Sequence, residues 1–219
     1  MKPTKELYDL LRKIHDHFNK ALFHNELKPV MFIITRRKKI MGCYIEQKWT
    51  KDNNISDEIA INPMYFDKFP ILEIMQTLVH EMCHQWQYNH GSPGRKGYHN
   101  KEFATKMQAI GLMPSSTGEP GGKTTGQHMN DYAIENGKFM IAAKKLLDQK
   151  AFKSLWYDRN SLNLSSSDAD GDSDSDGEDA SDKKKKIKYT DSVCELNIWG
   201  KPGLNILCAD CGDPYEPNI

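Results

Sequence analysis

Residues 79–103 read VHEMCHQWQYNHGSPGRKGYHNKEF, and they begin with the HExxH pattern of His80, Glu81 and His84. On an α-helix, residues four positions apart lie on one face about 5–6 Å from each other, so the two imidazoles can bind one metal ion. Glu81 is offset around the helix axis, where it can reach a metal-bound water without being a ligand. Zinc lowers the pKa of such a water to about 7, and the carboxylate can then accept its proton during attack on a carbonyl.

A catalytic zinc usually has three protein ligands and one open position, and three residues compete for the third place. His90 has the metzincin spacing from His84, but Gln87 stands where that motif needs a glycine to reverse the chain. In a continued helix His90 would point away from the site. Glu102 has a spacing that suits gluzincins, and His99 lies at the start of the same later segment. The residues alone leave His99 and Glu102 both open.

The run 79–103 resembles the SprT-like metallopeptidase family, which includes the Spartan-type proteases of DNA–protein crosslinks. The family's third histidine lies in a G-x-H-x-x-(E/D)-F-like segment, and this resemblance assigns His99 as the third zinc ligand. It also implies that His80 and His84 are ligands and that Glu81 is the catalytic glutamate. Residues 111–132 and 196–212 resemble bacterial and phage-type SprT-like proteins that end in a zinc ribbon.

A second metal site is predicted near the C-terminus. Cys208 and Cys211 form a CxxC knuckle followed by glycine, whereas the earlier pair of a zinc ribbon reads Asp191-Ser-Val-Cys194, with aspartate in place of the first cysteine. An Asp–Cys₃ zinc site is expected, because this short segment needs a metal to fold. The alternatives are three cysteines with a water, or a degenerate ribbon without metal.

Hydrophobic periodicity and turn residues predict an α+β fold. We expect a helix over 5–25, strands over 31–35, 42–49 and 58–62, and the HExxH helix over 71–88. A shorter helix should run between Asn100 as its N-cap and Gly111, followed by a loop over 114–127 and a helix over 139–156. The expected domains are a zincin-like metallopeptidase domain over 1–164, a disordered acidic linker over 165–186 and a zinc-ribbon-like module over 187–219.

Charge is segregated along the 219 residues although the formal net charge is zero. Residues 1–164 hold 24 Lys and Arg against 17 Asp and Glu, whereas residues 165–182 hold eight acidic side chains and no basic ones. The basic excess leaves DNA binding open without establishing it. No apolar run is long enough for a membrane span, and no secretory signal is visible. Five unevenly placed cysteines do not form a disulfide framework, so we expect an intracellular protein, cytoplasmic or nuclear.

The sequence therefore predicts a zinc-dependent peptidase with a protein substrate, and the family resemblance implies substrates associated with or crosslinked to DNA. The alternative is a non-catalytic nucleic-acid-binding protein that uses the ribbon and keeps the zincin fold as a scaffold. The intact Glu81 argues against this alternative, because a scaffold does not need that carboxylate. A metal-dependent hydrolase acting on another substrate class is a third reading. The oligomeric state is not predicted.

Overall fold

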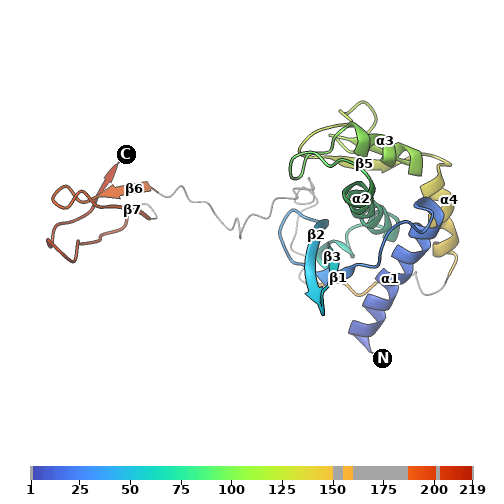
Figure 1. Ribbon diagram of the computed structural model, residues 1–219, viewed down its shortest axis with the longest axis horizontal. Helices are drawn as coiled ribbons and strands as arrows, with labels where there is room; N and C mark the ends of the chain where they lie inside the picture. The colour runs from blue at the N-terminus through green and yellow to red at the C-terminus, as the bar shows by residue number, and fades with distance from the viewer. Residues whose placement is uncertain (1, 150–154, 160–186, 201–202, 219) are drawn as a thin grey trace. The chain divides into compact units, whose positions relative to one another are not determined.

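The computed structural model describes residues 2–149, 155–159, 187–200 and 203–218. The chain divides into two compact units, residues 1–175 and 176–219, which are described separately below. Helices and strands are mixed in an α+β arrangement, as predicted (Figure 1). The acidic linker predicted over 165–186 lies outside the described residues. None of the helices in the described ranges combines the length and apolar character needed to cross a membrane.

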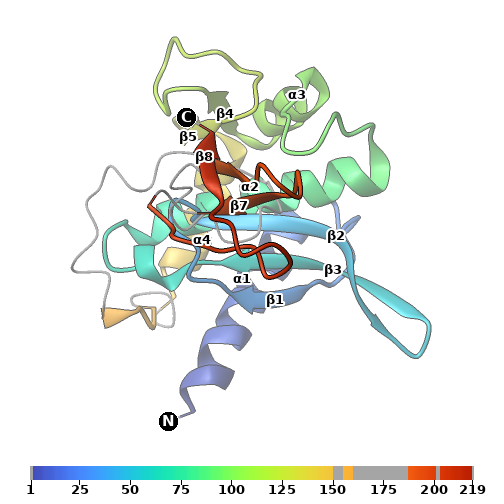
Figure 2. The same ribbon diagram turned by 90° about the vertical axis from the view of Figure 1, so that its left-hand side faces the viewer.

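A three-stranded sheet forms one layer of the first unit (Figure 2). Its strands are β1 (Met31–Ile34), β2 (Gly42–Lys51) and β3 (Asn54–Ile61), in the order β1-β3-β2. β3 pairs with β1 in parallel and with β2 in antiparallel orientation. Asp52 and Asn53 connect β2 to β3 with positive φ angles, which short polar residues tolerate in tight hairpin turns. β2 is consequently an edge strand of this sheet.

Three helices surround the core of the first unit, and α1 (Pro3–Leu22) and α2 (Ile71–His90) also contact the sheet. α1 packs against α4 (Lys138–Leu147) and α2, and α2 also packs against β2 and β3. Pro70 fixes the chain direction just before α2, as expected for a proline at a helix start. A short 3₁₀ helix, Pro63–Tyr65, follows β3. The largest fully buried side chains of this unit are Tyr65, Phe18, Phe23, Phe103, Phe139, Leu11, Ile14, Ile59, Ile61 and Met75.

The capping residues predicted for the shorter helix are confirmed. α3 (Lys101–Ile110) begins after Asn100, whose Oδ1 accepts a hydrogen bond from the Phe103 amide at 3.0 Å. Gly111 ends it with a φ of 96°. A Cβ at that position would lie 2.7 Å from the Lys138 nitrogen, so both the left-handed backbone and the close approach require glycine.

Several secondary-structure boundaries need correction; the strand expected over 58–62, for example, begins at Asn54. The loop expected over 114–127 begins too early, because Pro114 and Ser115 belong to β4 (Leu112–Ser115), which pairs antiparallel with β5 (Asn130–Ala133). Proline is tolerated there because each strand of a two-stranded sheet has an unpaired edge. The helix expected over 139–156 ends at Leu147; residues 155–158 are not helical, and 150–154 lie outside the described residues.

The second unit contains a three-stranded antiparallel sheet of its own. Its strands are β6 (Ile187–Thr190), β7 (Asn197–Gly200) and β8 (Glu216–Asn218), in the order β7-β6-β8. The central strand β6 contributes Tyr189, whose side chain is buried. The strands bring two chain turns together, and these turns carry the cysteines discussed below.

Candidate metal centre

α2 carries three of the predicted site residues on one stripe. His80 and Glu81 are buried and His84 is half-buried. The opposite side of the helix packs into the core through Met75, Leu78, Val79 and Met82. The apolar side therefore fixes the rotation of α2 and presents the polar stripe to the rest of the site.

His99 approaches this stripe from the segment before α3. Its backbone pairs with Gly126 through hydrogen bonds of 2.8 and 3.1 Å in the two directions. The His99 Nε2 atom lies 3.1 Å from the Nε2 atoms of both His80 and His84. The Phe103 ring stacks on His84, with ring centroids 4.3 Å apart, and also contacts the other two imidazoles. The structure thus brings the three predicted ligands together in one cluster.

The hydrogen bonds of the outer ring nitrogens determine what the inner nitrogens can bind. His80 Nδ1 lies 2.7 Å from Asp131 Oδ2, and His99 Nδ1 lies 3.3 Å from the Gly126 carbonyl oxygen. Because these oxygens accept hydrogen bonds, they favour the tautomer in which Nδ1 carries the hydrogen and Nε2 directs its lone pair inward. In this tautomer, lone pairs facing each other at 3.1 Å would repel unless a cation lay between them.

Zinc fits this set of donors. Zinc–nitrogen bonds of about 2.0–2.1 Å in a tetrahedron place the nitrogens roughly 3.3 Å apart, close to the observed separations. Three imidazole ligands would leave a fourth position for water or substrate, as a catalytic site requires. The cluster is therefore compatible with zinc.

Glu102 and His90, the other two candidates for the third zinc ligand, make contacts outside the histidine cluster. Glu102 Oε2 accepts hydrogen bonds of 2.7 Å from the Gln87 side chain and from the Ser92 amide. Gln87 Nε2 also donates to Asn100 Oδ1 at 2.7 Å. These bonds hold the segment that brings His99 back to α2. α2 does continue to His90, which is exposed and whose Nε2 lies 3.3 Å from the Glu26 carbonyl oxygen.

Asp131 is a further candidate site residue that no sequence pattern indicated. It lies on β5, and its carboxylate accepts the Nδ1 hydrogen of His80 at 2.7 Å. The Gln76 side chain donates to the Asp131 carbonyl oxygen at 2.8 Å, which ties β5 to α2. A carboxylate in this position fixes the tautomer of a ligand histidine and raises its basicity. Because 51 residues separate His80 from Asp131, no local sequence motif predicts this contact.

Replacing Asp131 with asparagine is expected to weaken zinc binding at the histidine cluster by about 10–100-fold, as is typical for such outer partners. Asparagine keeps the shape but loses the charge that favours the required tautomer. Zinc affinity, measured by competition with a chromophoric chelator, checks this. Asp148→Asn, which makes the same change at the end of α4, should leave the affinity unchanged. Equal affinity in both variants would show that Asp131 does not support the centre.

A cleft of about 450 Å³ opens onto His80 and Glu81. Its walls come from the start of β2, from α2, from the 117–119 loop and from β5. Burial raises the pKa of Glu73, a further acidic side chain of this cleft. Glu81 therefore lines the cleft together with His80.

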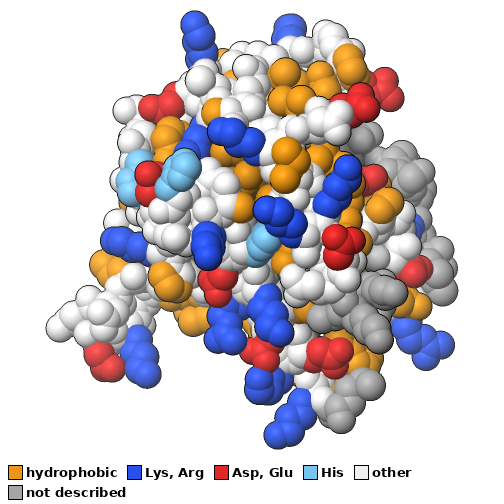
Figure 3. All heavy atoms as spheres, turned by 90° about the vertical axis from the view of Figure 1, so that its right-hand side faces the viewer, with side chains coloured by type: hydrophobic (Ala, Val, Ile, Leu, Met, Phe, Trp, Pro, Cys, Tyr) orange, Lys and Arg blue, Asp and Glu red, His pale blue; other side chains and the backbone are white. Residues whose placement is uncertain are grey.

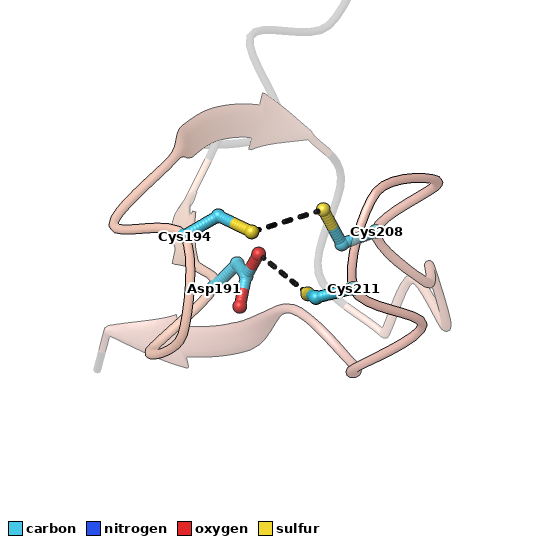
Figure 4. A group of neighbouring side chains, drawn as sticks. All are labelled: Asp191, Cys194, Cys208 and Cys211. Carbon is cyan, nitrogen blue, oxygen red and sulfur yellow. Dashed lines mark hydrogen bonds between the residues drawn. The ribbon is translucent and has the colours of Figure 1, made fainter.

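The second predicted donor set also converges. Asp191, Cys194, Cys208 and Cys211 bring one ligand atom each within 4.8 Å of one another (Figure 4). Hydrogen bonds, the strongest from the Cys208 thiol, hold the pKa of Asp191 well below its usual range. Asp191 itself is buried.

Comparison with known proteins gives one family and one short relative. The SprT-like family model matches residues 11–124, a range that includes both the HExxH residues and His99. An uncharacterized protein in the mucB 3′ region of Salmonella typhimurium is 45% identical over 40 residues, which cover 18% of this chain and 54% of that protein. The chain thus spans about half the length of this relative. No solved structure matches the chain.

Proposed function

The chain belongs to the SprT-like family, and from this premise we propose that it is a zinc-dependent peptidase with a zincin-like domain built around α2. The observation that carries the proposal is the convergence of the imidazole nitrogens of His80, His84 and His99, of which His80 lines a cleft together with Glu81. Hydrolysis of a denatured protein by the zinc-loaded chain, and its loss on adding a chelator, is the test. Undiminished hydrolysis with chelator would refute it.

The roles of the chain's own residues follow from their positions. His80, His84 and His99 would hold the zinc through Nε2, oriented by Asp131 and the Gly126 carbonyl group. Zinc, when bound, polarises a substrate carbonyl group and lowers the pKa of water. Glu81 accepts the proton of the attacking water and returns it to the amide nitrogen that leaves. Its burial keeps this carboxylate close to the reacting atoms and away from bulk water.

A polypeptide substrate is supported by the strand that borders the cleft. β2 lies at the edge of its sheet, and its first residue, Gly42, lines the cleft. An edge strand offers backbone hydrogen-bonding groups to which an extended peptide can add as a further strand. This arrangement favours a protein substrate over a small molecule.

Gly42 has a second role, because it allows β2 to approach the catalytic glutamate. A Cβ at this position would lie 2.8 Å from Thr77 Cγ2 and 3.1 Å from Glu81 Oε1. Replacing Gly42 with alanine is therefore expected to displace Glu81 and lower kcat by about 10–100-fold, since small misplacements of catalytic groups are costly. Zinc content should stay unchanged, because no zinc ligand is touched.

The control for this prediction is a rescue. Thr77→Ser removes the methyl group that a Cβ at position 42 would meet and keeps the Oγ1 hydrogen bond to the Glu73 carbonyl oxygen. The double variant Gly42→Ala/Thr77→Ser should recover part of the lost kcat. Gly94→Ala, whose Cβ would make contacts of 3.4 Å or longer, should have no effect. Full activity in Gly42→Ala would contradict the role given to this glycine.

Association with DNA stays a prediction from the family resemblance. Lys and Arg side chains are spread over the face shown in Figure 3, with acidic side chains among them, and do not gather into one patch there. The four consecutive basic residues at positions 36–39 lie in the turn between β1 and β2, where Arg36 pairs with Asp158 at 2.7 Å. We propose DNA-associated proteins as substrates on the resemblance alone.

A further inference from the structure

We propose that the second unit is folded around a zinc ion bound by three thiolates and one carboxylate, with Asp191 as a ligand. This centre is separate from the histidine cluster and has a different chemical character. Its four donors come from two turns of the chain, at 191–194 and 208–211 (Figure 4).

The backbone of each turn directs its donors inward. Asp191 Oδ1 accepts a hydrogen bond from the Val193 amide at 2.9 Å, which leaves Oδ2 facing the cysteines, 3.2 Å from Cys211 Sγ. In the other turn the Gly212 amide donates to the Cys208 carbonyl oxygen at 2.9 Å, and Gly212 takes a φ of 81°. Each of the two turns therefore supplies two donors, and Asp191 supplies the fourth one beside the three cysteines.

The separations suit tetrahedral zinc. Cys194 Sγ and Cys208 Sγ lie 4.0 Å apart. Zinc–sulfur bonds of about 2.3 Å place two thiolates roughly 3.8 Å apart around a tetrahedral ion. A disulfide needs sulfurs about 2.05 Å apart, and all three cysteines are free. One disulfide among them would also leave the third thiol and the buried carboxylate unexplained.

The unit needs such a centre because it has almost no apolar core. Among its described residues, Tyr189 and Cys208 are the buried hydrophobic side chains. Five large apolar side chains of the same unit are exposed: Val193, Leu196, Trp199, Leu204 and Leu207. A segment of this size cannot offset its conformational entropy by burial alone, so metal binding supplies its folding free energy.

The charges of the four donor groups also favour a bound metal ion. One carboxylate and three thiolates within 4.8 Å of one another would concentrate negative charge in a small volume. A divalent ion compensates this charge, and one carboxylate with three thiolates gives the same net charge as four thiolates. Aspartate can therefore replace cysteine without changing the overall charge of the site, although its oxygen is a harder donor.

Cobalt(II) substitution in the full-length chain tests the proposal. Thiolate ligands give cobalt a near-ultraviolet charge-transfer absorption that imidazole and carboxylate ligands do not, so the histidine cluster does not contribute. The wild-type chain should show this absorption. Asp191→Cys should raise its intensity by roughly one third, because the thiolate count rises from three to four. Asp191→Ala should weaken metal binding at this centre by at least about 10-fold.

Asp210→Asn is the matched control, because Asp210 lies in the second turn but is exposed. It should leave both the absorption and the affinity unchanged. The proposal is overturned if the wild-type chain shows no thiolate absorption, if Asp191→Cys leaves the intensity unchanged, or if Asp191→Ala binds metal as tightly as the wild type. None of these outcomes depends on peptide hydrolysis, so failure here is distinguishable from failure of the proposed peptidase function.

Discussion

Replacing His99 with alanine is expected to weaken zinc binding at the histidine cluster by at least about 100-fold, more than the loss of an outer partner typically costs. The substitution removes the one nitrogen that lies 3.1 Å from both other Nε2 atoms. His80 and His84 alone cannot complete the three-ligand set of a catalytic zinc. Peptide hydrolysis should disappear with the metal. Metal content per chain and chelator competition measure the loss.

Two further alanine variants test the choice of ligand. His90→Ala should retain the zinc, because that side chain is exposed at the end of α2. Glu102→Ala should weaken binding less than His99→Ala does, because Glu102 supports the returning segment through Gln87 and Ser92. Equal metal loss in His99→Ala and His90→Ala would overturn the assignment. If Glu102→Ala alone emptied the centre, a carboxylate would be the third ligand.

Replacing Glu81 with glutamine should lower kcat by about 100–10,000-fold, the usual contribution of a general base. Glutamine preserves the shape of the side chain but cannot accept the proton. Zinc content should match the wild type, because the three imidazoles stay in place. Turnover of a denatured protein and metal analysis of the same sample measure both effects.

Glu135→Gln is the matched control for this substitution, since Glu135 is exposed after β5. It should retain full activity. Comparable turnover by Glu81→Gln and wild type would exclude Glu81 as the base. Loss of zinc from Glu81→Gln would instead assign a structural role to this carboxylate.

Features set by neighbours in the chain could be predicted from the sequence. The HExxH helix, the Asn100 cap and the Gly111 terminus depend on contacts within a few residues, and each lies where the pattern indicates. His99 needed the family resemblance, because the residues alone did not separate it from Glu102. The structure gives the physical reason: Glu102 is already engaged by Gln87 and Ser92.

Features set by long-range contacts could not be predicted. Asp131 reaches His80 across 51 residues, from a strand that contains Asn130 and Asp131 and lacks the alternation of a typical strand. Gly42 matters because β2 passes close to Glu81, which depends on how the sheet packs against α2. The helix expected over 139–156 was too long because helical periodicity does not by itself mark where a helix ends.

Mass spectrometry of the products formed from an unfolded protein tests most directly whether a zinc ion held by the three histidines hydrolyses peptide bonds. The zinc-loaded chain should generate new amino and carboxyl termini, chelator-treated protein should generate none, and restoring zinc should restore the same cleavage sites. The carboxyl termini formed in ¹⁸O-water should carry the label, because water supplies the new oxygen. Identical products from the chelated chain, or intact substrate after incubation with fully loaded protein, would contradict zinc-dependent peptide hydrolysis by this chain.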